Sequence, residues 1–187
     1  MAITQAQNYG YGYGSGSRGF LTNIMGPYAN FRMDPYNAGF NFSSTAWPSA
    51  NLAIYWPFAI MQPIVFDTFY TMNGATATGT IDMGVYDLQS LNLIKSVGSG
   101  TNQTGTTAVQ SFTVGVTVLP AGTYLFGMSL SSGSATLQAL TVMGARYLHY
   151  GGYRQQSTAH PLPSTAVPVA LTNDFMPIFG MRAIAQT

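Results

Sequence analysis

Charge is scarce in this sequence. Of its 187 residues, 6 are lysine or arginine and 5 are acidic, so charged residues make up 6% of the chain, against about 25% in an ordinary soluble domain. The net charge is +1, and the basic residues form no cluster. The electrostatic attraction that supplies most of the affinity for nucleic acids and anionic membranes is therefore missing. We expect neither a nucleic acid nor a membrane as a partner.

Cysteine is absent altogether, which excludes disulfides, thiolate metal sites and thiol redox chemistry. The 2 histidines lack the paired spacing of a zinc site, and no stretch has the acidic pattern of a calcium loop. We expect no metal and no cofactor.

Long apolar runs are also missing. The longest, Leu52 to Phe66, is interrupted by Pro57, Gln62 and Pro63, whereas a membrane-spanning helix needs about 20 apolar residues. The start of the chain has neither the basic residues nor the apolar run of a secretory signal. We expect a protein that is made in a cytoplasm and does not cross a membrane.

What the chain does contain is neutral polar residues: 21 Thr, 15 Ser, 10 Asn and 10 Gln. Because 47% of the residues are hydrophobic, the sequence does not have the low hydrophobicity of a disordered chain. A length of 187 residues suits a single main domain with a full core.

Residues 1–50 differ in texture from the rest, with a YGYGYGSGS tract from Tyr9 to Ser17 followed by mixed Gly, Pro, Asn and aromatic residues. We interpret this segment as an extended N-terminal arm. A floppy tail is the alternative, but aromatic side chains bring much contact area for little loss of freedom, so an arm that adheres to its own body or to a neighbour is favoured. Its candidate contact residues are Tyr9, Tyr11, Tyr13, Phe20, Tyr28 and Trp47.

Residues 51–187 read as a β-domain. Short apolar or alternating runs are separated by Gly, Ser, Asn and Thr, and no amphipathic helix is evident. Within 109–119, alternation is expected to place Phe112, Val114, Val116 and Val118 on one apolar face. Eight strands in two sheets are typical of a jelly roll, so we predict an all-β, eight-stranded antiparallel β-sandwich of this kind. The expected strands lie at 55–60, 64–70, 78–86, 93–97, 109–119, 123–129, 136–142 and 175–185.

A long irregular stretch, residues 144–171, interrupts the β-pattern, and such a length usually marks a functional or interface loop. Its candidate contact residues are His149, Tyr150, Tyr153 and Arg154, which could stack on a sugar or a partner and donate hydrogen bonds. The alternative, which we favour, is a loop that closes the sandwich or packs on a sister subunit.

Catalytic patterns are weak. Serine, histidine and aspartate are all present, but the GxSxG turn that exposes a nucleophilic serine is not. The GxGxxG match at Gly14 to Gly19 does not lie between a strand and a helix, where it would bind a dinucleotide. We expect Asp82 to face solvent on a strand and Asp87 to cap a turn. A glycan hydrolase would need paired carboxylates, and the chain has five scattered aspartates and no glutamate. We therefore expect no enzyme.

Four stretches of the β-domain together carry a resemblance to a known family: AIYWPFAIMQPIVFDTFYTMN (53–73), TIDMGVYDLQSLNLIK (80–95), TVLPAGTYLFGMSL (117–130) and MPIFGMRAIA (176–185). They resemble, in this order, a jelly-roll module of structural proteins of tailed bacteriophages, most of all capsid cement (decoration) proteins. The resemblance implies a homotrimer on the outside of the virion that stabilises the capsid lattice, with the major capsid protein as its partner. A head-fibre or tail-fibre tip that binds a receptor or carbohydrate is the alternative. The arm at 1–50 is not part of the pattern.

Overall fold

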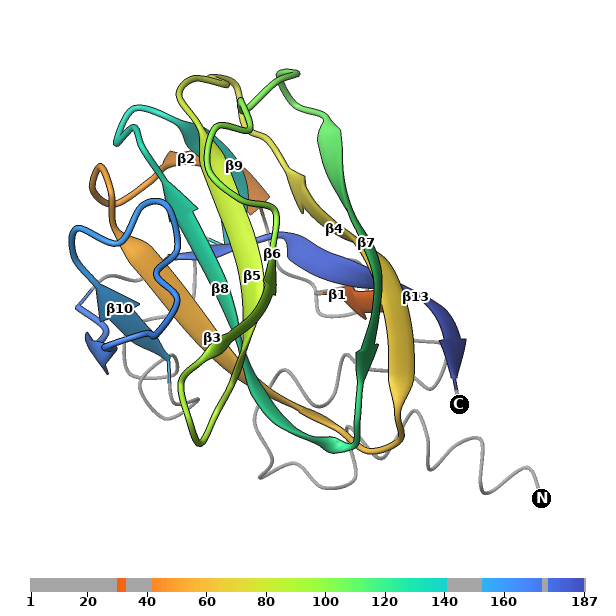
Figure 1. Cartoon of the computed structure of the whole chain (residues 1–187). Helices are drawn as coiled ribbons and strands as arrows, with labels where there is room; N and C mark the ends of the chain where they lie inside the picture. The colour runs from red at the N-terminus through yellow and green to blue at the C-terminus, as the bar shows by residue number, and fades with distance from the viewer. Residues whose placement is uncertain (1–29, 33–41, 141–152, 173–174, 187) are drawn as a thin grey trace.

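The computed structural model of the chain describes residues 30–32, 42–140, 153–172 and 175–186 (Figure 1). These residues form thirteen β-strands and no helix, and neighbouring strands pair antiparallel throughout. The prediction of an all-β, antiparallel sandwich is confirmed. The strands are β1 (Asn30–Arg32), β2 (Phe42–Ala46), β3 (Ala53–Ile60), β4 (Ile64–Met72), β5 (Ile81–Asp87), β6 (Leu93–Ser96), β7 (Val109–Leu119), β8 (Gly122–Leu130), β9 (Thr136–Leu140), β10 (Arg154–Gln156), β11 (Val169–Ala170), β12 (Met176–Pro177) and β13 (Phe179–Gln186).

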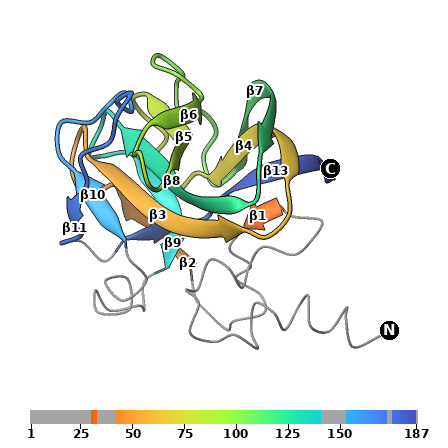
Figure 2. The same cartoon turned by 60° about the horizontal axis from the view of Figure 1, so that its bottom comes forward.

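The strands are arranged in three sheets (Figures 1 and 2). A four-stranded sheet has the order β1-β13-β4-β7, and a six-stranded sheet has the order β11-β10-β3-β8-β5-β6. A small third sheet, β12-β9-β2, lies at one end. The two larger sheets form the two sides of the sandwich in Figure 2, and their facing side chains make the main core.

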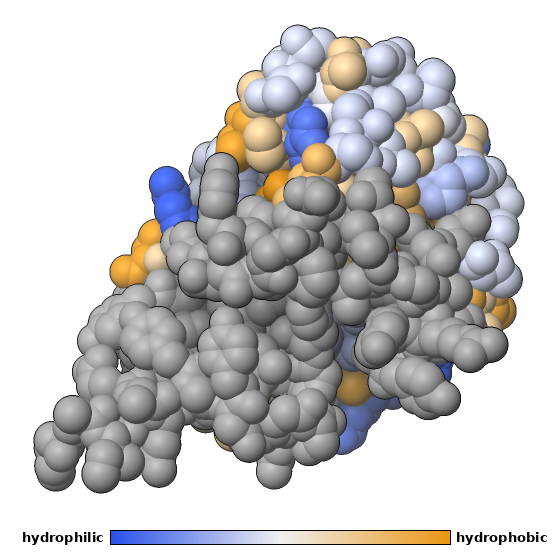
Figure 3. All heavy atoms as spheres, turned by 180° about the vertical axis from the view of Figure 1, so that it is seen from behind, coloured by the Kyte–Doolittle hydropathy of each residue, from blue (hydrophilic) through white to orange (hydrophobic). Residues whose placement is uncertain are grey.

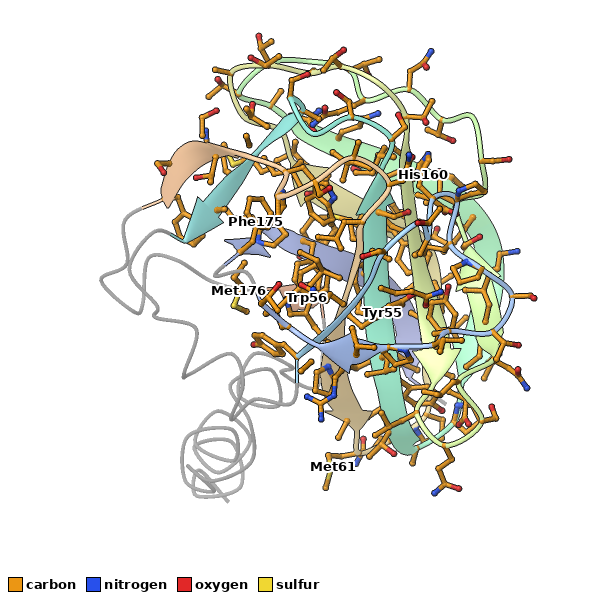
Figure 4. All side chains as sticks on the ribbon, turned by 90° about the vertical axis from the view of Figure 1, so that its left-hand side faces the viewer. Tyr55, Trp56, Met61, His160, Phe175 and Met176 are labelled. Carbon is orange, nitrogen blue, oxygen red and sulfur yellow. The ribbon has the colours of Figure 1, made fainter. Side chains whose placement is uncertain are left out.

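Aromatic rings from both sheets join in the centre of that core. The ring of Phe179 on β13 lies 4.6 Å from the ring of Trp56 on β3 and 4.5 Å from that of Phe126 on β8. Phe69 on β4 meets Phe126 edge to face at 5.5 Å. All four side chains are fully buried, and pairs of this geometry add to the stability that their buried area gives. The sheets are therefore held together by rings that reach across the interface; Figure 4 shows one of them, Trp56, in the middle of the body.

Each of the eight predicted strands has a counterpart, and the structure adds short strands that the sequence pattern does not indicate. The predicted strand at 175–185 is divided into β12 and β13, and β9 ends at Leu140. The additional strands β1 and β2 lie within the expected arm, and β10 and β11 lie within the long irregular stretch. These are short pieces whose formation depends on a neighbouring strand, which local periodicity cannot reveal.

Part of the irregular stretch covers the outer face of the six-stranded sheet. Residues 157–168, which we call the cover, place Ala159, Leu162 and Ala166 against Tyr55 of β3 and Tyr86 of β5 in a second buried cluster. The hydroxyl of Tyr86 donates to the carbonyl of Pro163 at 2.8 Å. The central strands of this sheet are thus buried on both faces, as in sheets that are covered on each side.

The described part of the expected arm contributes to the body. β1 pairs with β13, and β2 pairs with β9 along its whole length. Trp47 follows β2 directly and is 1% exposed, with its ring 5.1 Å from that of Phe175. Residues 42–47 therefore belong to the packed sandwich.

Candidate interface on the four-stranded sheet

A β-bulge in β7 turns two valines out of the core. β7 and β4 pair regularly from Val109 to Thr113 and again from Thr117 to Leu119, with a shift between these segments. Gly115 lies in the shift with a φ of +78°, a left-handed conformation that glycine adopts without strain. An inserted residue of this kind changes which face the following side chains point to.

The inversion is plain in the exposure of the side chains on either side of Gly115. Phe112 is 5% exposed and belongs to the core, whereas Val116 is 71% and Val118 is 55% exposed. The prediction that Phe112, Val114, Val116 and Val118 share one apolar face is therefore wrong for the last two, which lie on the opposite face from Phe112. Strict alternation is valid only while the pairing register is unbroken.

The two valines form part of what we call the aliphatic patch: Val65, Val116, Val118 and Ile184. Val65 is 9% exposed, and the other three residues supply the exposed area of the patch. Val65 on β4 pairs directly with Val118, so the two side chains lie on the same face of the sheet. Ile184 lies on β13 at a second register shift, beside the segment that pairs with Val65, and is 48% exposed. The patch occupies the ends of β4, β7 and β13 that lie toward the lower right in Figure 1.

The turn between β3 and β4 brings a further apolar side chain to this end of the molecule. Met61 is 70% exposed and projects from the lower end of the body in Figure 4. Scattered apolar residues are normal on a surface. Here, however, neighbouring strands bring several together on one end of one sheet.

An ion pair lies beside the patch on the same sheet. Arg182 on β13 donates from Nε to Oδ1 of Asp67 at 3.0 Å and from Nη2 to Oδ2 at 2.7 Å, the two-pronged geometry that arginine and carboxylate favour. Hydrogen bonding to Arg182 and to Thr68 lowers the pKa of Asp67 below its ordinary value. Because both oxygens of Asp67 accept from Arg182, a partner that covers the neighbouring apolar residues would not leave this carboxylate as an unpaired charge.

Two of the predicted contact residues lie in the core instead of at a surface. Trp47 donates from Nε1 to the carbonyl of Leu52 at 3.0 Å and is 1% exposed. Tyr153 is 2% exposed, and its hydroxyl donates to Sδ of Met176 at 3.6 Å; burial raises its pKa above the ordinary value. Because both rings are buried, neither can contact a partner or stack on a sugar in this structure. Their burial results from packing next to short strands, which the spacing of residues in the sequence does not show.

Arg154 differs from its neighbour in being only half-buried. It opens β10, and its Nη1 donates to the carbonyl of Tyr153 at 3.0 Å. The structure does not bring Arg154 together with the aliphatic patch, since β10 belongs to the six-stranded sheet. The remaining predicted contact residues lie outside the described residues: Tyr9, Tyr11, Tyr13, Phe20, Tyr28, His149 and Tyr150.

Beneath the cover, the structure assembles a polar cluster of serine, histidine and aspartate. Nδ1 of His160 lies 3.0 Å from Oγ of Ser129, and Nε2 lies 2.8 Å from Oγ1 of Thr80. Ser129 has no solvent exposure, so no substrate can reach its hydroxyl. The histidine bridges two hydroxyls, whereas a nucleophilic triad requires it to bridge serine and carboxylate.

Asp82, the acidic member of the cluster, is 1% exposed, so the prediction that it faces solvent is wrong. Its Oδ1 accepts from the backbone N–H of Gly98 at 2.9 Å, and its Oδ2 accepts from that of Leu162 at 3.0 Å. Burial raises its pKa above the ordinary value, against the effect of these hydrogen bonds. The cover supplies one of the two donors, which is why the local pattern did not predict burial. By contrast, Asp87 caps a turn as predicted, accepting from the backbone N–H of Ser90 at 2.7 Å.

Two further features are absent from the described residues. In that part of the chain, no group of three or more histidine or acidic residues is placed to hold a metal ion. No helix there is long and apolar enough to cross a membrane.

No protein-family model matches the chain, and no curated protein matches it in sequence.

Proposed function

We propose that this chain is a jelly-roll structural protein of a tailed-bacteriophage virion: a cement protein that binds the outside of the head as a trimer and stabilises the capsid lattice. The order of strands in the two large sheets carries the proposal. A jelly roll is a long antiparallel hairpin of eight strands wound into two sheets, so its first strand pairs with its eighth, its second with its seventh, and so on inward.

Eight strands of this chain fit that scheme. In chain order they are β1, β3, β4, β5, β6, β7, β8 and β13. The outermost pair of the hairpin is β1 with β13, followed by β3 with β8, β4 with β7, and β5 with β6 at the tip. The other strands add to the edges or form the small third sheet. Viral capsid proteins are among the main users of this fold, although fold alone does not fix function.

The surface supports an adhesive role. The described surface in Figure 3 is mostly pale, with few strongly hydrophilic residues, in keeping with a charged fraction of 6%. Neutral polar groups can be covered by a partner without the desolvation penalty that ions carry. The aliphatic patch offers apolar area: at about 25 cal/mol per Å², a standard interface of about 1,600 Å² contributes tens of kcal/mol before the costs of association.

A trimer needs a head-to-tail interface that closes after three copies, so two different surfaces of each copy must meet. The proposal therefore predicts a particle of three chains of 20.0 kDa in purified protein, which light scattering coupled to size-exclusion chromatography measures. A monomer at micromolar concentration would contradict the trimer.

The place on the virion has its own test. A lattice cement must be present in numbers comparable to the capsid subunits, because each copy bridges neighbouring subunits. We expect mass-spectrometric counting of purified virions, from the bacteriophage whose genome encodes the chain, to find it in the same order of copies as the major capsid protein. A handful of copies per particle would instead favour a fibre tip.

A further inference from the structure

Exposed aliphatic side chains gather at two places on the described surface. One holds Val116 and Val118, which we call the first valine pair. The other holds the second valine pair, Val167 and Val169, which are 68% and 57% exposed. The first pair lies on β7 and the second in the cover and β11, on different sides of the sandwich in Figure 2. The other exposed large apolar residues of the described chain lie at the same end as the first pair or occur singly: Met61, Ile184, Ile94 and Val109.

The two pairs have the same geometry. Each consists of residues i and i+2, whose side chains point to the same side of an extended chain about 7 Å apart. Val116 and Val118 share a face of β7 after the bulge. Pro168 separates Val167 from Val169 and restricts the residue before it to an extended conformation. Two pairs of equal spacing can interdigitate, as the facing side chains of packed sheets do.

Both pairs also lie at the edge of a large sheet. The edge strands are β1 and β7 in the four-stranded sheet and β11 and β6 in the six-stranded sheet. Natural edge strands are often protected from pairing with other chains by a charged residue, above all lysine. β1 contains Arg32, and β6 contains Lys95, the one lysine of the sequence. β7 and β11 contain no charged residue, so they are the edges that lack this protection.

The two unprotected edges are matched in length. The bulge divides β7, and the segment beyond it that pairs regularly with β4 is 117–119. β11 has two residues, and Pro168 before it has no backbone N–H with which to extend the pairing. A short segment can therefore lie beside a short segment, and neither offers the long, flat edge that leads to aggregation.

A head-to-tail interface joins two different surfaces of neighbouring copies, and the two valine pairs are different surfaces with matching chemistry. We propose that in the trimer the first valine pair of each copy packs on the second valine pair of the next copy, with the edges of β7 and β11 side by side. The inference rests on the proposed function, because the trimer supplies the second copy. The bulge at Gly115 then serves assembly, since it turns Val116 and Val118 outward.

An exchange of charges tests the contact. The variants Val118→Asp and Val169→Lys each place one unpaired charge in the proposed interface. Each should raise the protein concentration at which half of the trimer has dissociated by more than about tenfold. The double variant Val118→Asp, Val169→Lys places opposite charges across the interface and should recover the mass of three chains of 20.0 kDa by light scattering. Its dissociation midpoint should rise in about 1 M sodium chloride, which screens the introduced pair, whereas that of the wild type should not.

Two controls separate this contact from a general effect of charge. The variant Val118→Lys, Val169→Lys carries like charges and should stay dissociated. Val109→Asp changes another exposed valine of β7, on the other side of the bulge from Val118, and should keep the mass of the wild type. The substituted side chains are all more than half exposed, so circular dichroism and thermal unfolding should show an intact fold. Val116→Thr, Val118→Thr is a milder variant that keeps the β-branched shape, and it should also raise the midpoint.

The particle mass and its recovery decide the outcome. A trimer that persists in the single variants, or a double variant that does not recover, would overturn the inference and leave the proposed trimer intact. Particles that grow beyond three chains with concentration would also overturn it, because the contact would then repeat without closing. A wild-type monomer would contradict the trimer of the proposed function, and the inference would fail with it.

Discussion

His160 is held between two hydroxyl groups and beside a buried carboxylate, and this position makes it sensitive to pH. Burial lowers its pKa below the ordinary 6.5, although the charge of Asp82 acts in the opposite direction. The titratable group that faces it in the described structure is Asp82; Ser129 on β8 and Thr80 before β5 supply the hydrogen-bonding hydroxyls. Figure 4 shows His160 at the outer side of the six-stranded sheet, where the cover meets it.

We predict that the free energy of unfolding decreases as pH falls below about 6.5. The unfolded chain, with the ordinary pKa, binds a proton at His160 more readily than the folded chain in that range, so protonation favours unfolding. The raised pKa of Asp82 has the opposite sign: its contribution is greatest below its ordinary value of 3.8 and is lost as pH rises above it. Urea denaturation between about pH 5 and about pH 8 measures the slope.

The variant His160→Gln provides the comparison, because it keeps a hydrogen-bonding side chain, does not titrate and leaves His149 in place. It should be less stable than the wild type at pH 8 and should lose much of the slope near pH 6. An unchanged slope in the variant would assign the pH dependence to another group.

Elsewhere in this molecule, neutral amide side chains make the buried polar contacts that charged side chains make in many other proteins. Asn73 is fully buried and Gln103 is 4% exposed. Nε2 of Gln103 donates to Oδ1 of Asn73 and to the carbonyl of Thr136, both at 2.9 Å. Nδ2 of Asn73 donates to Oε1 of Gln110 at 2.9 Å. In this cluster the buried amides are thus satisfied by one another and by a backbone carbonyl, without a charged partner.

At the scale of the elements, the bulge in β7 depends on one residue. Gly115 has a φ of +78°, and a Cβ built there meets no atom within 4 Å. We predict that Gly115→Ala lowers the free energy of unfolding by about 1–2 kcal/mol, entirely through the left-handed backbone and not through a clash. Ser111→Ala, at an exposed position of the same strand, should change it by less than about 0.5 kcal/mol. Chemical denaturation gives both values, and equal effects of the two substitutions would refute a special role for Gly115.

The elements differ in how much of their structure could be predicted from the sequence. The long strands were predictable because each of them alternates or forms a bounded β-branched run, and β7 was placed correctly at 109–119. The aliphatic patch was not predicted, because it arises from a register shift. An isolated glycine inside a strand is a signal of a bulge, and Gly115 is the residue that could have revealed it. The burial of Trp47, Asp82 and Tyr153 results from contacts between segments far apart in the chain, which no local pattern contains.

At the scale of the whole molecule, the small number of charges determines how assembly should respond to salt. In the described structure, Arg182 and Asp67 form a short-range ion pair on the four-stranded sheet, and charged residues are 6% of the chain. An interface held by exposed charges weakens when salt screens them. One made of neutral polar and apolar groups does not, and sulfate strengthens apolar burial because it is excluded from protein surfaces.

We therefore predict that the proposed trimer persists, with the same mass by light scattering, from about 0.1 M to about 1 M sodium chloride. Its midpoint of dissociation on dilution should move to lower protein concentration in ammonium sulfate, since more apolar area is buried in the assembled form. The variant Asp67→Asn, Arg182→Gln removes the ion pair beside the patch and should leave the salt response unchanged. If the mass fell toward that of a single chain as sodium chloride rose, charge pairing would be the main contribution to assembly. Salt can weaken assembly only by screening charged residues at the interface. With so few charged residues in the chain, that result would mean that they are concentrated there, and the neutral surface would need another explanation.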